Sequence, residues 1–321
     1  MSGRASRWPR RLLLVLVAAA ALAVVFSTWF SHRLLLEVLS GRAFGAPSET
    51  ISDPMELGFR GDPGKAFGLA FEDVVIDTPL GPAPAWFVPA DVGATPASGS
   101  AAIFVHGIGG AREDGYPFLP ELHAAGLPVL LMTYRNDPGA PAAPEGLRLF
   151  GLTEWEDLDA SVANLETRGF RRVVLVGASM GGGIVGQFLA RSPRAGMVSA
   201  LVLDAPALDA GMVLRHVTDR LRLPLRSLGA RLAIPALSLT HGVNLSQAAV
   251  IPVVAEFAGP VLLFHGSADR IVPAASSFAL LDARQGGTMF LQTRGDHLQS
   301  HLTEPERFAQ ILRGFLAALP H

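Results

Sequence analysis

The 321-residue sequence contains no cysteine and a single lysine, Lys65. Without cysteine the chain forms no disulfide bond, has no thiol nucleophile and holds no zinc through thiolates. Its 26 basic and 28 acidic residues give a formal net charge of -2 at pH 7. The chain therefore lacks the basic surplus that neutralises phosphates, and we expect no nucleic-acid partner. Charged residues make up 17% and hydrophobic residues 50%, enough for a sizeable core.

The N-terminal region carries an uncharged apolar run over residues 12–30. Its length is close to the roughly 20 residues that a helix needs to cross a bilayer. Residues 1–11 are basic, with arginines at Arg4, Arg7, Arg10 and Arg11. Few basic residues follow the run, so the positive-inside rule places the N-terminus in the cytoplasm and the rest of the chain outside. We expect a single-pass membrane anchor.

A cleaved signal peptide is the alternative for this segment, with secretion as its consequence. Residues 21–23 read Ala-Leu-Ala, the small-x-small pattern of a cleavage site. The apolar run continues through that site instead of turning polar, which favours an uncleaved anchor. Residues 31–70 are interpreted as a linker or lead-in, because much of this range is rich in glycine, proline and acidic residues without clear periodicity.

From residue 71 to residue 320 the pattern alternates between short apolar runs and longer amphipathic segments. Residues 71–78 and 83–90 flank a Gly-Pro turn and predict an antiparallel hairpin. The alternation that follows is typical of a mostly parallel sheet with helices on both faces. An insertion at about 208–258 interrupts it. The expected strands cover 101–107, 127–134, 171–179, 198–208, 260–266 and 288–295, and the clearest helix covers 153–169.

Three polar side chains follow strands of this predicted sheet. Ser179 follows the apolar run at 173–176, Asp269 follows the run at 261–264, and His297 follows the run at 289–293. Ligands of open parallel sheets bind at the carboxyl ends of the strands. A serine hydroxyl becomes a useful nucleophile when an imidazole takes its proton and a carboxylate orients that imidazole. These residues therefore predict nucleophilic acyl transfer at one edge of the sheet.

Glycines surround the candidate nucleophile in the stretch "GASMGGG". A serine on a sharp turn between a strand and a helix needs small neighbours, because the backbones approach closely there. Gly177 and Gly181 meet this need on either side of Ser179, and Gly107 belongs to a second glycine-rich turn, "HGIGG", after an earlier strand. The pattern favours a nucleophile elbow over an accidental glycine-rich turn.

At this point the sequence resembles the serine-nucleophile branch of the α/β-hydrolase superfamily. The motifs "HGIGG", "GASMGG", "HGSADRIVP" and "GDH" follow one another in that family's order, over about residues 71–319. The stretches "TYRNDPGAP" and "LVLDAPALD" are similar to a bacterial group of membrane-anchored, esterase- or lysophospholipase-like hydrolases. The resemblance implies an α/β-hydrolase fold with an eight-stranded sheet and a small helical cap. It also implies a bacterial cell membrane, and the positive-inside rule places the catalytic domain on the outer side of that membrane.

The resemblance assigns a role to each matching residue. Ser179 is the nucleophile, His297 the general base and then acid, and Asp269 the carboxylate that orients it. The backbone N–H groups of Ile108 and Met180 are the expected oxyanion donors. No cofactor and no metal ion are expected.

Several residues offer alternative readings. Asp204 ends the strand that precedes Asp269's, and it is the alternative candidate for the carboxylate that orients His297. His301 lies four residues after His297, a spacing that zinc sites use, but no third ligand is evident. The remaining polar candidates, interpreted as packed or local turn residues, are His106, His265 and Asp296.

The expected reaction is hydrolysis of a carboxylic ester, small or lipid-derived, through an acyl-enzyme. The same three residues serve thioesterases and serine peptidases, so these stay open as alternatives. A non-catalytic membrane-anchored binding protein is a third hypothesis, disfavoured because all three residues occur in order. The arginine-containing insertion is either a cap that touches lipid or an ordinary helical pair with a solvated face. Pro224 and Pro235 in its first half interrupt the helical periodicity and favour the helical pair. The sequence leaves the oligomeric state open.

Overall fold

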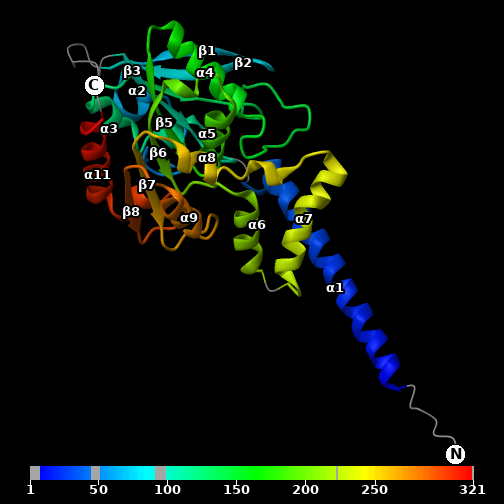
Figure 1. The fold of residues 1–321 in the computed structure, drawn as a ribbon. Coiled ribbons are helices and arrows are strands. Elements are labelled where there is room, and N and C mark those ends of the chain that lie inside the picture. Colours follow the sequence, from blue (N-terminus) through cyan, green and yellow to red (C-terminus); the bar gives the residue numbers. More distant parts are fainter. Residues whose placement is uncertain (1–7, 45–50, 91–98, 222, 320–321) are drawn as a thin grey trace, which may run out of the picture.

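The computed structural model describes residues 8–44, 51–90, 99–221 and 223–319, arranged around one eight-stranded sheet (Figure 1). The strand order is β1-β2-β4-β3-β5-β6-β7-β8. The strands are β1 (Glu72–Thr78), β2 (Gly81–Val88), β3 (Ser100–Val105), β4 (Val129–Met132), β5 (Arg172–Ala178), β6 (Val198–Asp204), β7 (Val261–Gly266) and β8 (Thr288–Thr293).

The predicted hairpin is confirmed at one edge of the sheet. Strand β1 pairs antiparallel with β2, from Glu72 opposite Phe87 to Thr78 opposite Gly81. Gly81 has φ of 130°, a conformation that favours glycine. Strand β2 then pairs antiparallel with β4, and every later pair in the order is parallel. The sheet is therefore mostly parallel, as predicted.

Strand β5 shows how the sheet separates two cores. Val173 and Leu175 belong to the core on one face, and Val174 and Val176 to the core on the other. Helices α4 (Trp155–Thr167), α5 (Met180–Arg191), α8 (Ile251–Glu256) and α9 (Ala275–Ala283) contribute to the first core. Helices α3 (Leu119–Ala124) and α11 (Pro305–Ala317) contribute to the second.

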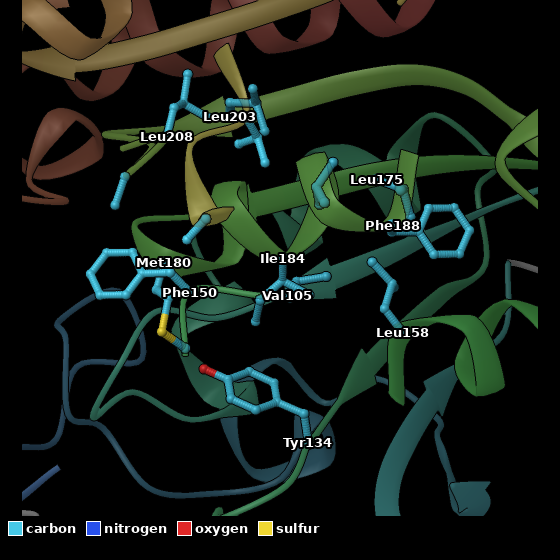
Figure 2. Packing of buried hydrophobic residues seen from close by; sticks show 14 of the residues in the cluster. Val105, Tyr134, Phe150, Leu158, Leu175, Met180, Ile184, Phe188, Leu203 and Leu208 are labelled. Carbon is cyan, nitrogen blue, oxygen red and sulfur yellow. The ribbon is translucent and has the colours of Figure 1, made fainter. Parts of the chain in front are cut away.

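The first core fixes the helix that follows the candidate nucleophile. Ile184 and Phe188 of α5 lie in one cluster with Leu175 of β5 and Leu158 of α4 (Figure 2). All four side chains are fully buried. Burying a side chain of this size contributes about 1.5–3 kcal/mol. These buried contacts along α5 fix the position of its first residue, which follows Ser179.

The insertion after β6 contains helices α6 (Ala210–Asp219) and α7 (Arg226–His241), the 3-10 helix η4 (Leu245–Ala248) and α8. Asp209 caps α6 by accepting a hydrogen bond from the Met212 N–H at 2.9 Å. Gly242 ends α7 with φ of 69°. Helices α6 and α7 extend from the sheet beside the N-terminal helix α1 (Trp8–Leu39) (Figure 1).

Helix α1 has 32 residues and continues nine residues beyond the predicted end at Phe30. The prediction of a linker over 31–70 is corrected for residues 31–39, and a short helix α2 (Pro63–Phe67) also lies in that range. The apolar run ends near Phe30, but the helix continues because Ser31, Leu35 and Leu39 are buried against the fold. Among the described residues, α1 is the one helix long and apolar enough by itself to cross a membrane. Arg4 and Arg7 lie outside the described residues.

Candidate active site

Ser179 lies at the sharp turn between β5 and α5. Its backbone has φ of 52° and ψ of -119°, a conformation that L residues rarely adopt and that costs about 1–3 kcal/mol. Backbone hydrogen bonds hold it: the Ser179 N–H donates to the Asp204 carbonyl at 2.9 Å, and the Ser179 carbonyl accepts from the N–H groups of Gly182 and Ala207 at 3.0 and 2.9 Å. Strain maintained by surrounding bonds is typical of functional turns.

The three predicted glycines lie where a side chain has no room. A Cβ added at Gly181 would lie 2.0 Å from the Val105 carbonyl oxygen. At Gly177 it would lie 3.0 Å from the Gly181 carbonyl group, and at Gly107 it would lie 2.8 Å from the Ser179 Cβ. The two glycine-rich turns can therefore pack against each other only without side chains.

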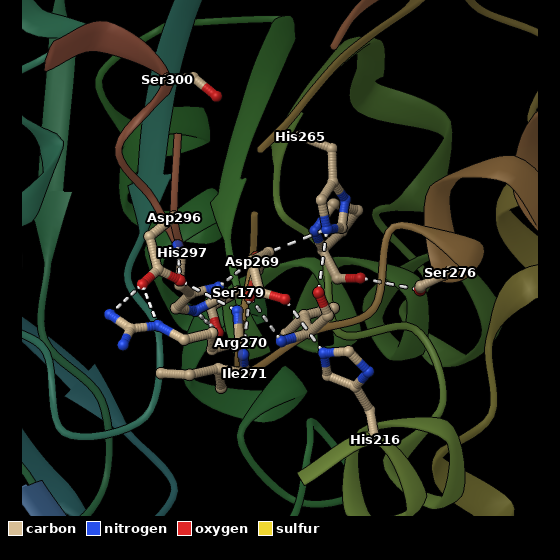
Figure 3. A network of polar contacts seen from close by, with 12 residues as sticks. Ser179, His216, His265, Asp269, Arg270, Ile271, Ser276, Asp296, His297 and Ser300 are labelled. Carbon is tan, nitrogen blue, oxygen red and sulfur yellow. Dashed lines mark hydrogen bonds and ion pairs between the residues drawn. The ribbon is translucent and has the colours of Figure 1, made fainter. Parts of the chain in front are cut away.

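The structure brings Ser179, His297 and Asp269 into one hydrogen-bonded chain (Figure 3). The Ser179 Oγ lies 2.9 Å from the His297 Nε2, and the His297 Nδ1 lies 2.7 Å from the Asp269 Oδ2. His297 Nδ1 faces a carboxylate and carries the proton, so Nε2 is left to accept the serine proton. This is the arrangement that activates a serine hydroxyl.

Asp269 is held as an ionised acceptor. Its Oδ1 accepts hydrogen bonds from the Ile271 and Val272 N–H groups, both at 2.8 Å, and its Oδ2 also lies 3.4 Å from the His265 Nε2. Burial would raise the pKa of Asp269, but hydrogen bonds with His265 and His297 outweigh burial and hold this pKa well below its usual range. The carboxylate therefore stays charged while it orients His297.

The rival carboxyl group, Asp204, has a different environment. It is buried at the end of β6, and among the described residues its Oδ1 has no hydrogen-bond partner. Burial raises the pKa of Asp204 to about 7. The structure places Asp269, not Asp204, against His297. Asp204 contributes its backbone carbonyl to the Ser179 turn instead.

The turn that contains Gly107 and Ile108 is supported by a buried polar network. The Gly107 carbonyl accepts hydrogen bonds from the Gly110 N–H at 3.1 Å, from the Tyr134 hydroxyl at 3.0 Å and from the His106 Nδ1 at 2.8 Å. The His106 Nε2 lies 2.8 Å from an oxygen of Asp137. His106 is packed, as predicted, but no role was predicted for Tyr134 and Asp137, although both lie in the stretch "TYRNDPGAP" that follows the apolar part of β4.

His106 is positively charged in this network, because both ring nitrogens face acceptors. Burial lowers the pKa of His106, but the adjacent Asp137 carboxylate outweighs burial and raises it above its usual value. Arg148 also reaches Asp137, at 3.3 Å. The network therefore places an ion pair directly under the turn that carries Ile108.

Ile108 and Met180 both line an apolar cavity that opens on Ser179. Met180 is the first residue of α5, and the N–H groups of a first helical turn have no acceptor within the helix. Its side chain is fully buried beneath the elbow. The two backbones thus flank the candidate nucleophile from the two glycine-rich turns.

The other polar candidates have local roles. Asp296 accepts hydrogen bonds from the His297 and Arg270 N–H groups at 2.8 and 2.9 Å and pairs with the Arg270 side chain. His265 lies 2.7 Å from the Ser277 hydroxyl. His301 lies 2.7 Å from the Met55 carbonyl through its Nε2. Within the described ranges no group of three metal-ligating side chains lies together.

Two cavities meet at Ser179. One has a volume of about 550 Å³ and includes charged side chains, among them Arg60, Asp114 and Arg270, in its lining. The other has a volume of about 190 Å³ and an apolar lining apart from Ser179. A substrate with one polar and one apolar side matches this division.

Comparisons with known proteins agree with the observed fold. The sequence pattern of the alpha/beta hydrolase family matches residues 102–311. An uncharacterized protein of Mycobacterium tuberculosis is 26% identical over 315 residues, which cover 95% of this chain and 94% of that protein.

Solved structures share the fold at low sequence identity. An esterase of Pyrococcus furiosus is 17% identical with a TM-score of 0.62, over 84% of this chain and 98% of that one. The esterase domain of a Rhodothermus marinus protein is 22% identical with a TM-score of 0.52, over 77% and 97%. These findings confirm the predicted α/β-hydrolase fold.

Proposed function

The chain belongs to the alpha/beta hydrolase family, and we propose that it is a serine esterase that cleaves a carboxylic ester through an acyl-enzyme. The observation that carries this proposal is the chain of hydrogen bonds from Ser179 through His297 to Asp269. The esterases among the structural relatives support the choice of an ester bond.

Acylation begins when the Ser179 Oγ attacks the ester carbonyl carbon and its proton passes to the His297 Nε2. The carbonyl π electrons move to oxygen, and the backbone N–H groups of Ile108 and Met180 stabilise the oxyanion. One such donor is worth about 10²–10³ in rate. The bond to the alcohol then breaks, and His297 returns the proton to the departing alkoxide. The acyl group is left as an ester on Ser179.

Deacylation repeats these steps with water. His297 takes a proton from water, the resulting hydroxide adds to the acyl carbon, and the Ser179 Oγ leaves with the proton that His297 returns. Asp269 keeps the imidazole in one tautomer and stabilises the imidazolium that forms in each half-reaction. No step needs a metal ion or an organic cofactor.

We further propose that α1 anchors this enzyme in a bacterial cell membrane, with the N-terminus in the cytoplasm and the catalytic domain outside. The uncharged run at residues 12–30 of α1 spans about 29 Å at 1.5 Å per residue, and the side chains of residues 12–22 are exposed. The hydrocarbon core of a bilayer is about 30 Å thick. The packed part of α1 starts at Ser27, next to Gly229 of α7. Cleavage and secretion is the alternative.

Kinetics on matched ester, thioester and anilide substrates test the function. We expect hydrolysis of esters by the full-length protein in detergent, with a loss of about 10⁶ in kcat in the Ser179→Ala variant. Preference for the anilide would point to a peptidase instead. Equal ester hydrolysis by the wild type and Ser179→Ala would refute the proposed nucleophile.

A further inference from the structure

The end of α1 forms a wall of the apolar cavity beside Ser179. Leu34, Leu35 and Val38 line that cavity together with Ser179 and Met180. Val38 lies four residues after Leu34 and three residues after Leu35, and these spacings place side chains next to one another on one face of a helix. The proposed anchor therefore reaches the active site itself.

Helix α6 supplies the facing wall. Its residues Ala210, Val213, Leu214 and Val217 line the same cavity and follow the spacing of one helical face. From first to last they extend about 10 Å along the helix. Every residue that lines the cavity, other than Ser179, is apolar. The cavity is thus an apolar slot between two helices with the nucleophile at one end.

Hydrogen bonds hold both walls relative to the catalytic residues. The Leu39 carbonyl at the end of α1 accepts from the Arg148 N–H at 2.8 Å. On α6, the His216 Nε2 lies 3.0 Å from the Asp269 backbone carbonyl. After α1, the Phe44 ring covers Gly109, where an added Cβ would lie 2.4 Å from the ring. The slot is therefore preformed.

The slot volume sets the size of its occupant. An apolar cavity of about 150 Å³ accepts benzene, which has six carbon atoms. The slot, at about 190 Å³, accommodates roughly six to eight carbon atoms on this scale. Polar groups gain nothing there, since within the described residues Ser179 provides the slot's one polar side chain.

We propose that this slot binds the acyl chain of the ester, with a preference for chains of about six to eight carbons, and that Leu34, Leu35 and Val38 of α1 determine this preference. The proposal rests on the proposed esterase function. The larger cavity, which includes Arg60 and Asp114, then receives the alcohol side of the ester. The acyl chain and the alcohol therefore extend from Ser179 into different cavities, because the two cavities meet there.

A series of p-nitrophenyl esters from two to twelve carbons tests the proposal on the full-length protein in detergent. We expect kcat/KM to rise by up to roughly fourfold per methylene, which corresponds to about 0.8 kcal/mol, up to six to eight carbons and then to level off. A flat response across hydrolysed esters would overturn the acyl slot and leave the esterase function standing. No ester hydrolysis, with no reaction at Ser179, would refute both.

Variants of Val38 test whether α1 determines the chain-length preference. In Val38→Phe, we expect the ratio of kcat/KM for the eight-carbon ester to that for the two-carbon ester to fall at least tenfold. In Val38→Ala, we expect the ratio of the twelve-carbon to the eight-carbon ester to rise. The matched control is Val25→Phe, which makes the same change at a position on α1 that is 65% exposed and away from the slot.

Either of these two kcat/KM ratios can show that α1 does not determine the acyl-chain preference. A Val38→Phe protein that unfolds at the wild-type temperature and keeps the wild-type ratio would overturn it. If Val38→Phe fails to fold, an unchanged ratio in Val38→Ala overturns it equally. A shift in Val25→Phe as large as that in Val38→Phe would also do so, because the effect would then lie outside the slot.

Discussion

Because the Asp204 carboxyl group is buried, we expect the Asp204→Asn variant to gain stability relative to the wild type as pH rises. Burial raises the pKa of Asp204 to about 7, above the value of about 3.9 expected in the unfolded chain. Between these values the folded state binds more protons than the unfolded state, so this group lowers the free energy of unfolding as pH increases. Its Oδ1 has no partner among the described residues, so the amide loses no hydrogen bond there.

The size of the effect follows from the pKa difference. At 1.36 kcal/mol per pKa unit, the cost of ionising Asp204 reaches about 4 kcal/mol above pH 7, of which about 3 kcal/mol develops between pH 5 and pH 8. The asparagine variant does not titrate. Its free energy of unfolding relative to the wild type is therefore expected to increase by about 3 kcal/mol over that range.

Urea unfolding of both proteins in the same detergent at pH 5 and pH 8 measures this difference. The exposed Asp282→Asn on α9 is the matched control, and we expect its difference from the wild type to stay constant. The reasoning is refuted if Asp204→Asn and the wild type change in parallel between the two pH values. Because Asp204 does not contact His297, we also expect Asp204→Asn to keep ester hydrolysis within about tenfold of the wild type.

Three further predictions concern the site. Asp269→Asn should lower kcat by about 10⁴, because His297 loses the tautomer that accepts the serine proton; wild-type kcat would contradict this. Gly181→Ala should lower kcat at least 10²-fold, since its Cβ would lie 2.0 Å from a backbone oxygen, whereas Gly196→Ala, with nothing within 4 Å, should match the wild type. Asp137→Asn should lower the free energy of unfolding by about 3–5 kcal/mol at pH 6, because it leaves the buried His106 cation without its partner; a loss below 1 kcal/mol would exclude that ion pair.

Local sequence patterns predicted the strands that precede the three residues of the proposed catalytic site. Ser179, Asp269 and His297 each follow an apolar run that forms β5, β7 or β8, and parallel strands bring their carboxyl ends to one edge. The glycines at Gly177 and Gly181 marked the close approach at the elbow. These features were predictable because each depends on residues adjacent in sequence and on the general geometry of parallel sheets.

Long-range packing was not predictable in the same way. The apolar run ends near residue 30, yet α1 continues to Leu39, because its last turns bury against residues distant in sequence. Nothing in the sequence near Val38 indicates that it lines a cavity with Ser179. The pairing of His106 with Asp137 likewise depends on how β3 and β4 place the loops that follow them.

Labelling with a fluorophosphonate probe, followed by peptide mapping, tests the central claim most directly. The phosphonyl group reacts with a serine that an adjacent imidazole activates, and its fluoride leaves. For the folded full-length protein we predict one labelled residue, Ser179, with labelling abolished in Ser179→Ala and strongly slowed in His297→Ala. Labelling of Ser179→Ala at the wild-type rate, or no labelling of the folded wild type, would contradict the account.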